Sequence, residues 1–253
     1  MITKANSKKS LVGEMFLSSE GDAFRVVGYV GNRYYRIVFD HDEHFQIAKQ
    51  NHIKNGNIKN KHHRNIFNIG YCGIGDYKTK TNGKHTKEYL AWRNMLKRCY
   101  DDHPNARDMS YKDCEVCERW HNFQNFAKWY EENYYEVEGE TMSIDKDILV
   151  KGNKVYSPET CCIVPLKINT FFSKYNGQRG DMPTGVFVND CGNYKVMCSN
   201  MFGEERYYGT YQTSTEAETV YKKIKNSMID KVVEEYALLI PARIIQAIKE
   251  WKY

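Results

Sequence analysis

The chain has 253 residues, of which 41% are hydrophobic and 27% are charged, and its formal net charge is +5 at pH 7. Its length exceeds what one small module needs, so a small disulfide-stapled fold is excluded, and because its composition is typical of globular domains we do not expect a wholly disordered chain. The 20 Tyr and 11 Phe residues supply enough bulk for more than one hydrophobic core.

The sequence carries no signal of export or of membrane insertion. No window approaches the ~18 consecutive apolar residues of a membrane span, and the basic first ten residues are not followed by an apolar stretch. We therefore expect a soluble cytoplasmic protein with no membrane partner. Its eight cysteines are then expected to be reduced thiols, with metal ligation as the alternative.

The positive charge is concentrated toward the N-terminus. Residues 1–75 hold 11 Lys and Arg against 6 Asp and Glu, whereas the remaining 178 residues hold 26 of each. Residues 49–64, called the basic segment below, contain no acidic residue. Contact with nucleic-acid phosphates and a merely solvated loop fit this composition equally well. The candidate DNA contacts in the basic segment are Lys54, Lys59, Lys61 and Arg64.

Residues 1–75 are predicted to form a small β module. The Gly31-Asn32 pair is typical of a hairpin turn, and the module ends in a glycine-rich stretch at 70–75. We expect a barrel-like sheet, followed by a linker at 76–87, where apolar periodicity is missing. Short β-branched or aromatic runs predict strands at residues 13–17, 24–30, 34–39 and 45–48.

From residue 88 onward the apolar period becomes helical. Apolar and aromatic residues recur every three or four positions at 90–100 and 120–130, which predicts two helices that each bury one face. A loose stretch with Gly and Pro at 176–184 marks the next boundary, so this central domain spans residues 88–176. A strand, a polar turn and a further apolar run are predicted at 142–144, 151–153 and 161–168.

Residues 177–253 are predicted to form a three-stranded sheet with two helices. Thr213 or Ser214 caps a long helix that has Glu216 in its first turn, and Pro241 opens the last helix. The predicted fold class is therefore α+β. The strands are expected at residues 186–188, 194–198 and 206–211.

Four motifs follow one another between residues 180 and 228. They are Pro183-Thr-Gly-Val186, Tyr194-Lys-Val196, Tyr208-Gly-Thr-Tyr211 and Tyr221-Lys-Lys-Ile-Lys225. This segment resembles the AP2-type DNA-binding domain of plant transcription factors and many phage nucleases. The resemblance implies a sheet in the DNA major groove, backed by the helix. A sheet and helix that pack against protein remain the alternative. The DNA contacts that the resemblance implies are Lys195 and Arg206, with Tyr194 and Tyr207 alongside.

The central domain carries a second ordered set of motifs. It reads Ser143-Ile-Asp-Lys-Asp147, then Gly152-Asn-Lys-Val-Tyr-Ser-Pro-Glu-Thr-Cys161, then Val164-Pro-Leu-Lys-Ile-Asn169. With the upstream Trp92-Arg-Asn-Met95, it resembles the HNH (ββα-metal) endonucleases of phages. The resemblance implies a strand–strand–helix core that holds Mg²⁺ or Mn²⁺ and cleaves or nicks double-stranded DNA, as homing-type enzymes do.

In that family an Asp binds the metal ion, an adjacent His acts as the base, and a later Asn or His completes the site. By resemblance, Asp145 fills the first role here, Lys146 stands at the base position, Thr160 replaces the later Asn, and Asn169 closes the motif. Asp147 is a second candidate metal ligand. If Asp145 starts a strand, Asp147 shares its face and Lys146 points the other way.

The lysine at the base position leaves the activity open. A lysine is protonated at neutral pH unless burial or nearby cations lower its pKa, so Lys146 between two aspartates is expected to stay charged and to clamp phosphate. One reading is a metal-dependent endonuclease. The other is a DNA-binding or regulatory protein on an inactive scaffold, in which Asp145 and Asp147 are turn residues. A protein-interaction module that never meets DNA is a third.

The cysteines offer a separate metal hypothesis. Cys114 and Cys117 form one CxxC pair, which is half of a structural zinc site. Cys99 and either Cys161 or Cys162 are the candidates to complete it, whereas free core thiols are the alternative. Two histidines, His103 and His121, are candidates for a base from outside the motif, although their spacing gives no support. His62 and His63 are expected to face phosphate or solvent.

Overall fold

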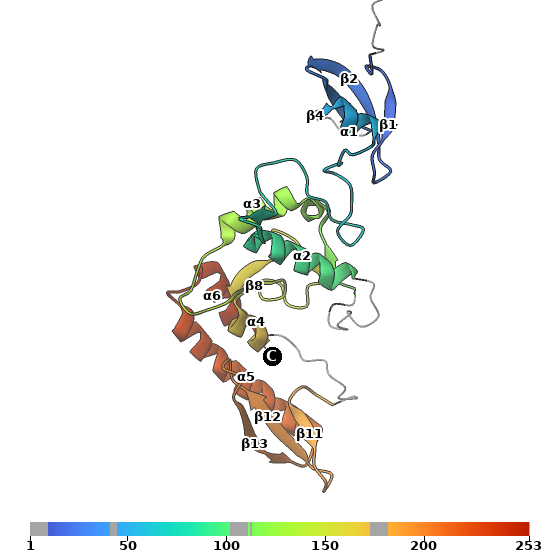
Figure 1. Cartoon of the computed structure of the whole chain (residues 1–253). Helices are drawn as coiled ribbons and strands as arrows, with labels where there is room; N and C mark the ends of the chain where they lie inside the picture. The colour runs from blue at the N-terminus through green and yellow to red at the C-terminus, as the bar shows by residue number, and fades with distance from the viewer. Residues whose placement is uncertain (1–9, 41–44, 102–110, 112, 173–181, 253) are drawn as a thin grey trace, which may run out of the picture. The chain divides into compact units, whose positions relative to one another are not determined.

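The computed structural model describes residues 10–40, 45–101, 111, 113–172 and 182–252. The chain is mixed α+β with several small sheets, and it divides into two compact units (Figure 1). The first unit comprises Met1–Asn65 and Tyr71–Gly75, and the second comprises Ile66–Gly70 and Asp76–Tyr253. No helix in the described part of the chain is both long and apolar enough to cross a membrane.

The first unit contains an antiparallel sheet whose four strands pair in chain order. Within the described residues the first strand does not pair with the fourth, so the predicted barrel-like closure is wrong and the sheet is an open meander. Closure is unnecessary because helix α1 (Gln50–Lys54) covers one face and buries Ile53 in the core. The strands are β1 (Met15–Leu17), β2 (Ala23–Gly31), β3 (Tyr34–Phe39) and β4 (Phe45–Lys49).

The predicted linker at residues 76–87 contains a short hairpin. Strands β5 (Lys80–Thr81) and β6 (Lys84–His85) are joined by Asn82-Gly83, and both turn residues have positive φ, as a tight hairpin turn requires. Both strands are exposed, which explains why apolar periodicity gave no sign of them. The Asn82-Gly83 pair was the sequence signal that could have predicted this hairpin.

Aromatic residues dominate the first core of the second unit. Helices α2 (Lys87–Tyr100) and α3 (Phe123–Asn133) pack together with a short 3₁₀ helix, η2 (Glu118–His121). Thr86 caps α2 by accepting a hydrogen bond from the Tyr89 N–H. The fully buried Trp92 Nε1 donates a hydrogen bond to the Trp120 carbonyl at 2.7 Å, which satisfies the one polar atom of its ring.

A strand–strand–helix segment lies between two cores of the second unit. Strand β8 (Met142–Asp145) pairs antiparallel with β10 (Cys162–Pro165), and helix α4 (Leu166–Phe172) follows at once. In the turn between the strands, β9 (Val155–Tyr156) pairs in parallel with β7 (Glu115–Val116). Because successive strand residues alternate between faces, Ile163 packs in the α2–α3 core and Val164 in a second core with α4.

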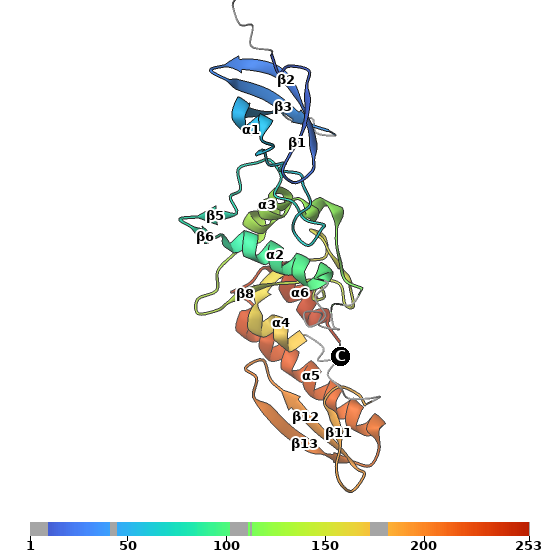
Figure 2. The same cartoon turned by 45° about the vertical axis from the view of Figure 1, so that its right-hand side comes forward.

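The C-terminal sheet packs against a long helix. The strands β11 (Val186–Val188), β12 (Tyr194–Ser199) and β13 (Glu205–Tyr211) pair in chain order. Figure 2 shows helix α5 (Ser214–Tyr236) along this sheet, and its far end joins the second core with helix α6 (Ala242–Glu250). Thr213 caps α5, and it is one of the two alternatives, Thr213 or Ser214, that the sequence predicts for this cap. The predicted boundary at 176–184 falls mostly on residues outside the described ones.

The contact between this sheet and α5 gives a stability prediction at Gly185. Its φ is +75°, and a Cβ there would lie 2.1 Å from the Tyr221 ring. We expect Gly185→Ala to lower the free energy of unfolding by about 2 kcal/mol through strain and overpacking. Gly192 has φ +78° with nothing within 4 Å, so Gly192→Ala isolates the backbone cost. Thermal unfolding measures both variants. If Gly185→Ala and Gly192→Ala lowered the free energy of unfolding equally, the clash with the Tyr221 ring would contribute nothing.

Candidate functional site

Asp145 ends strand β8, and its carboxylate belongs to the turn that follows. Its Oδ1 accepts hydrogen bonds from the backbone N–H of Asp147 at 2.7 Å and of Ile148 at 2.6 Å. The residue is 7% exposed, and this burial raises the pKa of its carboxyl to about 6, although the two backbone donors oppose the shift. Asp145 is therefore held by its own turn, in the manner of an Asx turn.

Lys146 is buried beside it, and its Nζ has two hydrogen-bond partners. Its Nζ donates hydrogen bonds to Asp147 Oδ2 at 2.7 Å and to the Asn153 carbonyl at 2.9 Å. Burial alone would lower its pKa, but the hydrogen bond and charge of Asp147 outweigh burial, and the pKa is raised. Lys146 is therefore protonated at neutral pH and cannot act as a base. Because the strand ends at Asp145, the expected alternation does not continue, and residues 146 and 147 contact each other.

The other two predicted catalytic residues lie in different surroundings. Asn169, on α4, reaches back to β8, where its Nδ2 donates to Ser143 Oγ at 2.9 Å. Thr160 Oγ1 donates to the Val155 carbonyl at 2.8 Å and so belongs to the turn between the strands. In the described part of the chain, Asp145 and Asp147 have no third His, Cys or acidic neighbour that would complete a group of metal ligands.

A cavity of about 150 Å³ lies between α2 and β8. Asn94 and Arg98 line it from α2, and Ser143 lines it from β8. Sequence reasoning did not single out Asn94 and Arg98 as site residues. Their four-residue spacing, which places both on one helix face, was the signal that could have found them.

The predicted zinc site is not formed. Cys99, Cys114 and Cys161 are buried in the α2–α3 core with Cys117 against it, whereas Cys162 faces the second core. The consecutive residues Cys161 and Cys162 face different cores, so only Cys161 lies on the same side as Cys99 and Cys114. Among the residues that the structure describes, no three cysteine sulfurs lie close enough to share a metal ion. Burial raises the pKa of Cys99 to about 12, which keeps it a thiol.

Of the two histidines outside the motif, only His121 lies in the described part of the chain, and it is not placed as a base. His121 Nε2 lies 3.0 Å from the Val116 carbonyl and packs edge-on to the Tyr100 ring, so it belongs to the aromatic core region. His103 lies outside the described residues. Among its described residues, the central segment therefore holds a buried carboxylate and an ion pair but no histidine placed as a base.

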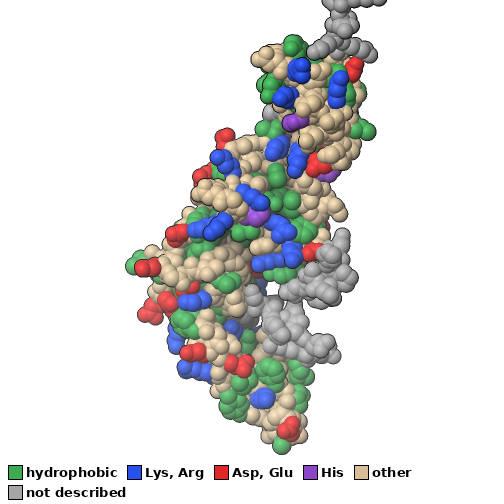
Figure 3. Space-filling model, in the orientation of Figure 1, with side chains coloured by type: hydrophobic (Ala, Val, Ile, Leu, Met, Phe, Trp, Pro, Cys, Tyr) green, Lys and Arg blue, Asp and Glu red, His purple; other side chains and the backbone are tan. Residues whose placement is uncertain are grey.

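The basic segment presents its cations to solvent. The four predicted DNA contacts, Lys54, Lys59, Lys61 and Arg64, are all exposed, and none forms an ion pair with a residue that the structure describes. Figure 3 shows Lys and Arg side chains gathered on the visible face of the N-terminal unit. Exposed cations without carboxylate partners are free to neutralise phosphates.

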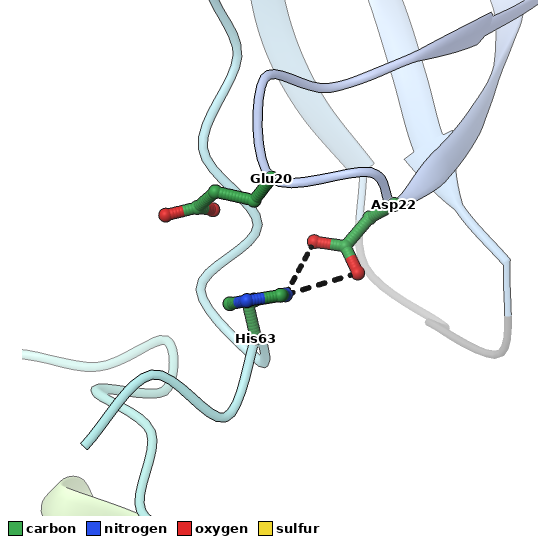
Figure 4. A group of neighbouring side chains, drawn as sticks. All are labelled: Glu20, Asp22 and His63. Atoms are coloured by element: carbon green, nitrogen blue, oxygen red, sulfur yellow. Dashed lines mark hydrogen bonds and ion pairs between the residues drawn. The ribbon is translucent and has the colours of Figure 1, made fainter. Parts of the chain in front are cut away.

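His63, within the basic segment, contacts the β1–β2 turn. Its Nδ1 lies 2.9 Å from Asp22 Oδ2, and Glu20 lies beside the pair (Figure 4). Ligand atoms of these three residues lie within 4.8 Å of one another, so the group could bind a metal ion. Sequence reasoning missed it because His63 is 41 positions from Asp22, and only the fold brings them together.

The C-terminal sheet places the two predicted DNA contacts on opposite faces. Val196 and Cys198 of β12 are buried against α5, so Lys195, which directly precedes Val196 in the strand, lies on the open face. Arg206 pairs with Cys198 across the strands and therefore lies on the α5 side. The two candidate contacts therefore do not share one face of the sheet, and whether either meets DNA stays a prediction. A bulge in the pairing of β12 with β13 sets this register.

The two tyrosines are divided in the same way. Tyr207 pairs with Met197 on the open face, whereas Tyr194 packs with the α5 side. Glu205 pairs with Ser199, also on the open face, and offsets the charge of Lys195. This sheet therefore offers little net positive charge to a nucleic acid.

Comparisons of the chain with family models, with curated proteins and with solved structures found no match in any of the three. The resemblances to HNH endonucleases and to AP2-type domains therefore stay predictions.

Proposed function

We propose that this chain is a DNA-binding protein that contacts double-stranded DNA through the basic segment and does not cleave it. The observation that carries the proposal is the run of exposed cations from Lys54 to Arg64, none of which is paired with a described carboxylate. Sequence-independent contact with phosphates supplies most non-specific affinity for DNA, and it needs such free cations on one surface.

The proposal that cleavage is absent rests on the ββα-like segment. Hydrolysis of a phosphodiester needs a metal ion and a base for the attacking water. Asp145 Oδ1 is engaged by two backbone donors, and the charge of Asp147 is offset by protonated Lys146. This segment acts as an inactive scaffold that links the two cores of the second unit.

A second candidate function is a Mg²⁺- or Mn²⁺-dependent DNA endonuclease of the HNH type. One observation favours it: the paired strands β8 and β10 are followed at once by α4, and Asn169 of that helix contacts β8 next to Asp145. In this version the side chain of Asp145 leaves its turn when metal and DNA bind, and Lys146 clamps the phosphate.

One experiment separates the two candidates. The full chain is incubated with supercoiled plasmid and Mg²⁺ or Mn²⁺, and duplex binding is followed in parallel by salt-dependent gel shift. We expect a gel shift without nicking. Nicking by the wild type that Asp145→Asn abolishes would establish the endonuclease, since Asn keeps the Oδ1 acceptor of the turn but loses the charge that a metal needs.

A further inference from the structure

The face of the N-terminal sheet that points away from α1 is exposed and rich in apolar side chains. Along β2 and β3, Phe24, Val26, Tyr35 and Ile37 are buried toward α1, so the alternate residues form the opposite face. Apolar surface of this kind on one side of a sheet is a mark of an interaction site. The exposed members of this outer face are Met15, Leu17, Arg25, Tyr34, Arg36, Phe45, Ile47 and Lys49.

The pairing register makes this set one continuous surface. Met15 pairs with Arg25 across β1 and β2, Arg36 pairs with Ile47 across β3 and β4, and Tyr34 pairs with Lys49 at the strand end. The Arg36 guanidinium lies 5.0 Å from the centroid of the Phe45 ring. Cations and apolar groups are therefore interleaved on the outer face rather than segregated.

The charges on the outer face that belong to described residues all have one sign. Arg25, Arg36 and Lys49 are its charged members, and none of the described side chains on it is acidic. A second copy of the chain is a poor occupant, because it would bring these cations against their own equivalents. The face instead suits a polyanion that also exposes apolar rings. A duplex stacks its bases internally, whereas an unpaired strand offers them for stacking.

We propose that the outer face binds single-stranded nucleic acid, with bases stacked on Phe45 and Tyr34 and phosphates paired with Arg25, Arg36 and Lys49. This inference rests on the proposed function only in taking DNA as the partner. It uses a different surface apart from Lys49, because the rest of the basic segment starts with α1, which covers the other face of the sheet. The two proposals can therefore fail separately.

The test measures fluorescence anisotropy of the full chain with an oligothymidylate of about 16 nucleotides and with a blunt duplex of equal length. We expect the double variant Tyr34→Ala and Phe45→Ala to lose at least about tenfold in affinity for the oligothymidylate while duplex affinity changes less than about twofold. The matched control is Phe202→Ala, which removes another exposed aromatic ring, 56% exposed, in the second unit.

Three outcomes would overturn this inference. The first is wild-type protein that does not bind the oligothymidylate, or a double variant that binds it with unchanged affinity. The second is a wild type that dimerises in sedimentation through Phe45, so that Phe45→Ala makes it monomeric, which would assign the face to self-association. Loss of oligothymidylate binding only in variants of Lys54, Lys59 and Lys61 would also assign the single strand to the basic segment instead.

Discussion

Replacing Lys54, Lys59 and Lys61 together with glutamine is expected to weaken duplex binding by about a thousandfold at 0.1 M salt, or about tenfold for each phosphate contact. Each lost contact releases one fewer counterion, so the slope of log affinity against log salt should flatten by about 0.9 per contact. All three side chains are exposed, and the substitutions should leave the fold of the first unit intact. Binding isotherms over a series of salt concentrations measure both effects.

The matched control changes the net charge by the same amount elsewhere. Lys223, Lys231 and Lys249 are exposed on α5 and α6 of the second unit. Glutamine at these three positions should leave the salt slope within error of the wild type. If both triple variants lost affinity equally, only the overall charge would matter, and the basic segment would be merely solvated.

Replacing Asp145 with Asn is expected to stabilise the protein at pH 7.5 by up to about 3 kcal/mol. Burial raises the pKa of Asp145 to about 6 in the folded chain, against about 3.9 when it is unfolded. The native state therefore binds this proton more tightly, so the stability from this group is present below pH ~4 and is lost as the pH rises through ~6. Asn is neutral throughout and keeps the Oδ1 acceptor of the turn.

The measurement is urea unfolding of wild type and variant at a series of pH values, followed by tryptophan fluorescence. All four tryptophans lie in the second unit, which also contains Asp145. Asp230→Asn, which removes one carboxylate at an exposed position on α5, is the matched control. A loss of stability in Asp145→Asn at pH 7.5 would contradict the account of Asp145 as a buried turn carboxylate.

Local signals in the sequence predicted much of the secondary structure. Alternating apolar residues located the strands of both main sheets, and Thr213 marked the start of α5 through its hydroxyl. These features depend on neighbours within a few positions of the chain. The Asn82-Gly83 turn was equally local, but its exposed strands lack the apolar pattern on which the prediction relied.

The site residues depend on contacts that sequence spacing does not reveal. The bulge between β12 and β13 decides that Arg206 faces α5, and nothing in the local pattern indicates it. Whether Asp145 points to solvent or into its own turn depends on where β8 ends. The proximity of His63 to Asp22 follows only from the packing of the segment after α1 on the β1–β2 turn.

The central claim is that the basic segment is the surface that meets duplex DNA. Amide hydrogen exchange of the full chain, read by mass spectrometry with and without a saturating duplex, tests it most directly. The account predicts slower exchange across residues 50–64 and unchanged exchange across residues 142–172. Protection confined to residues 142–172 or to the C-terminal sheet, with none in 50–64, would contradict it.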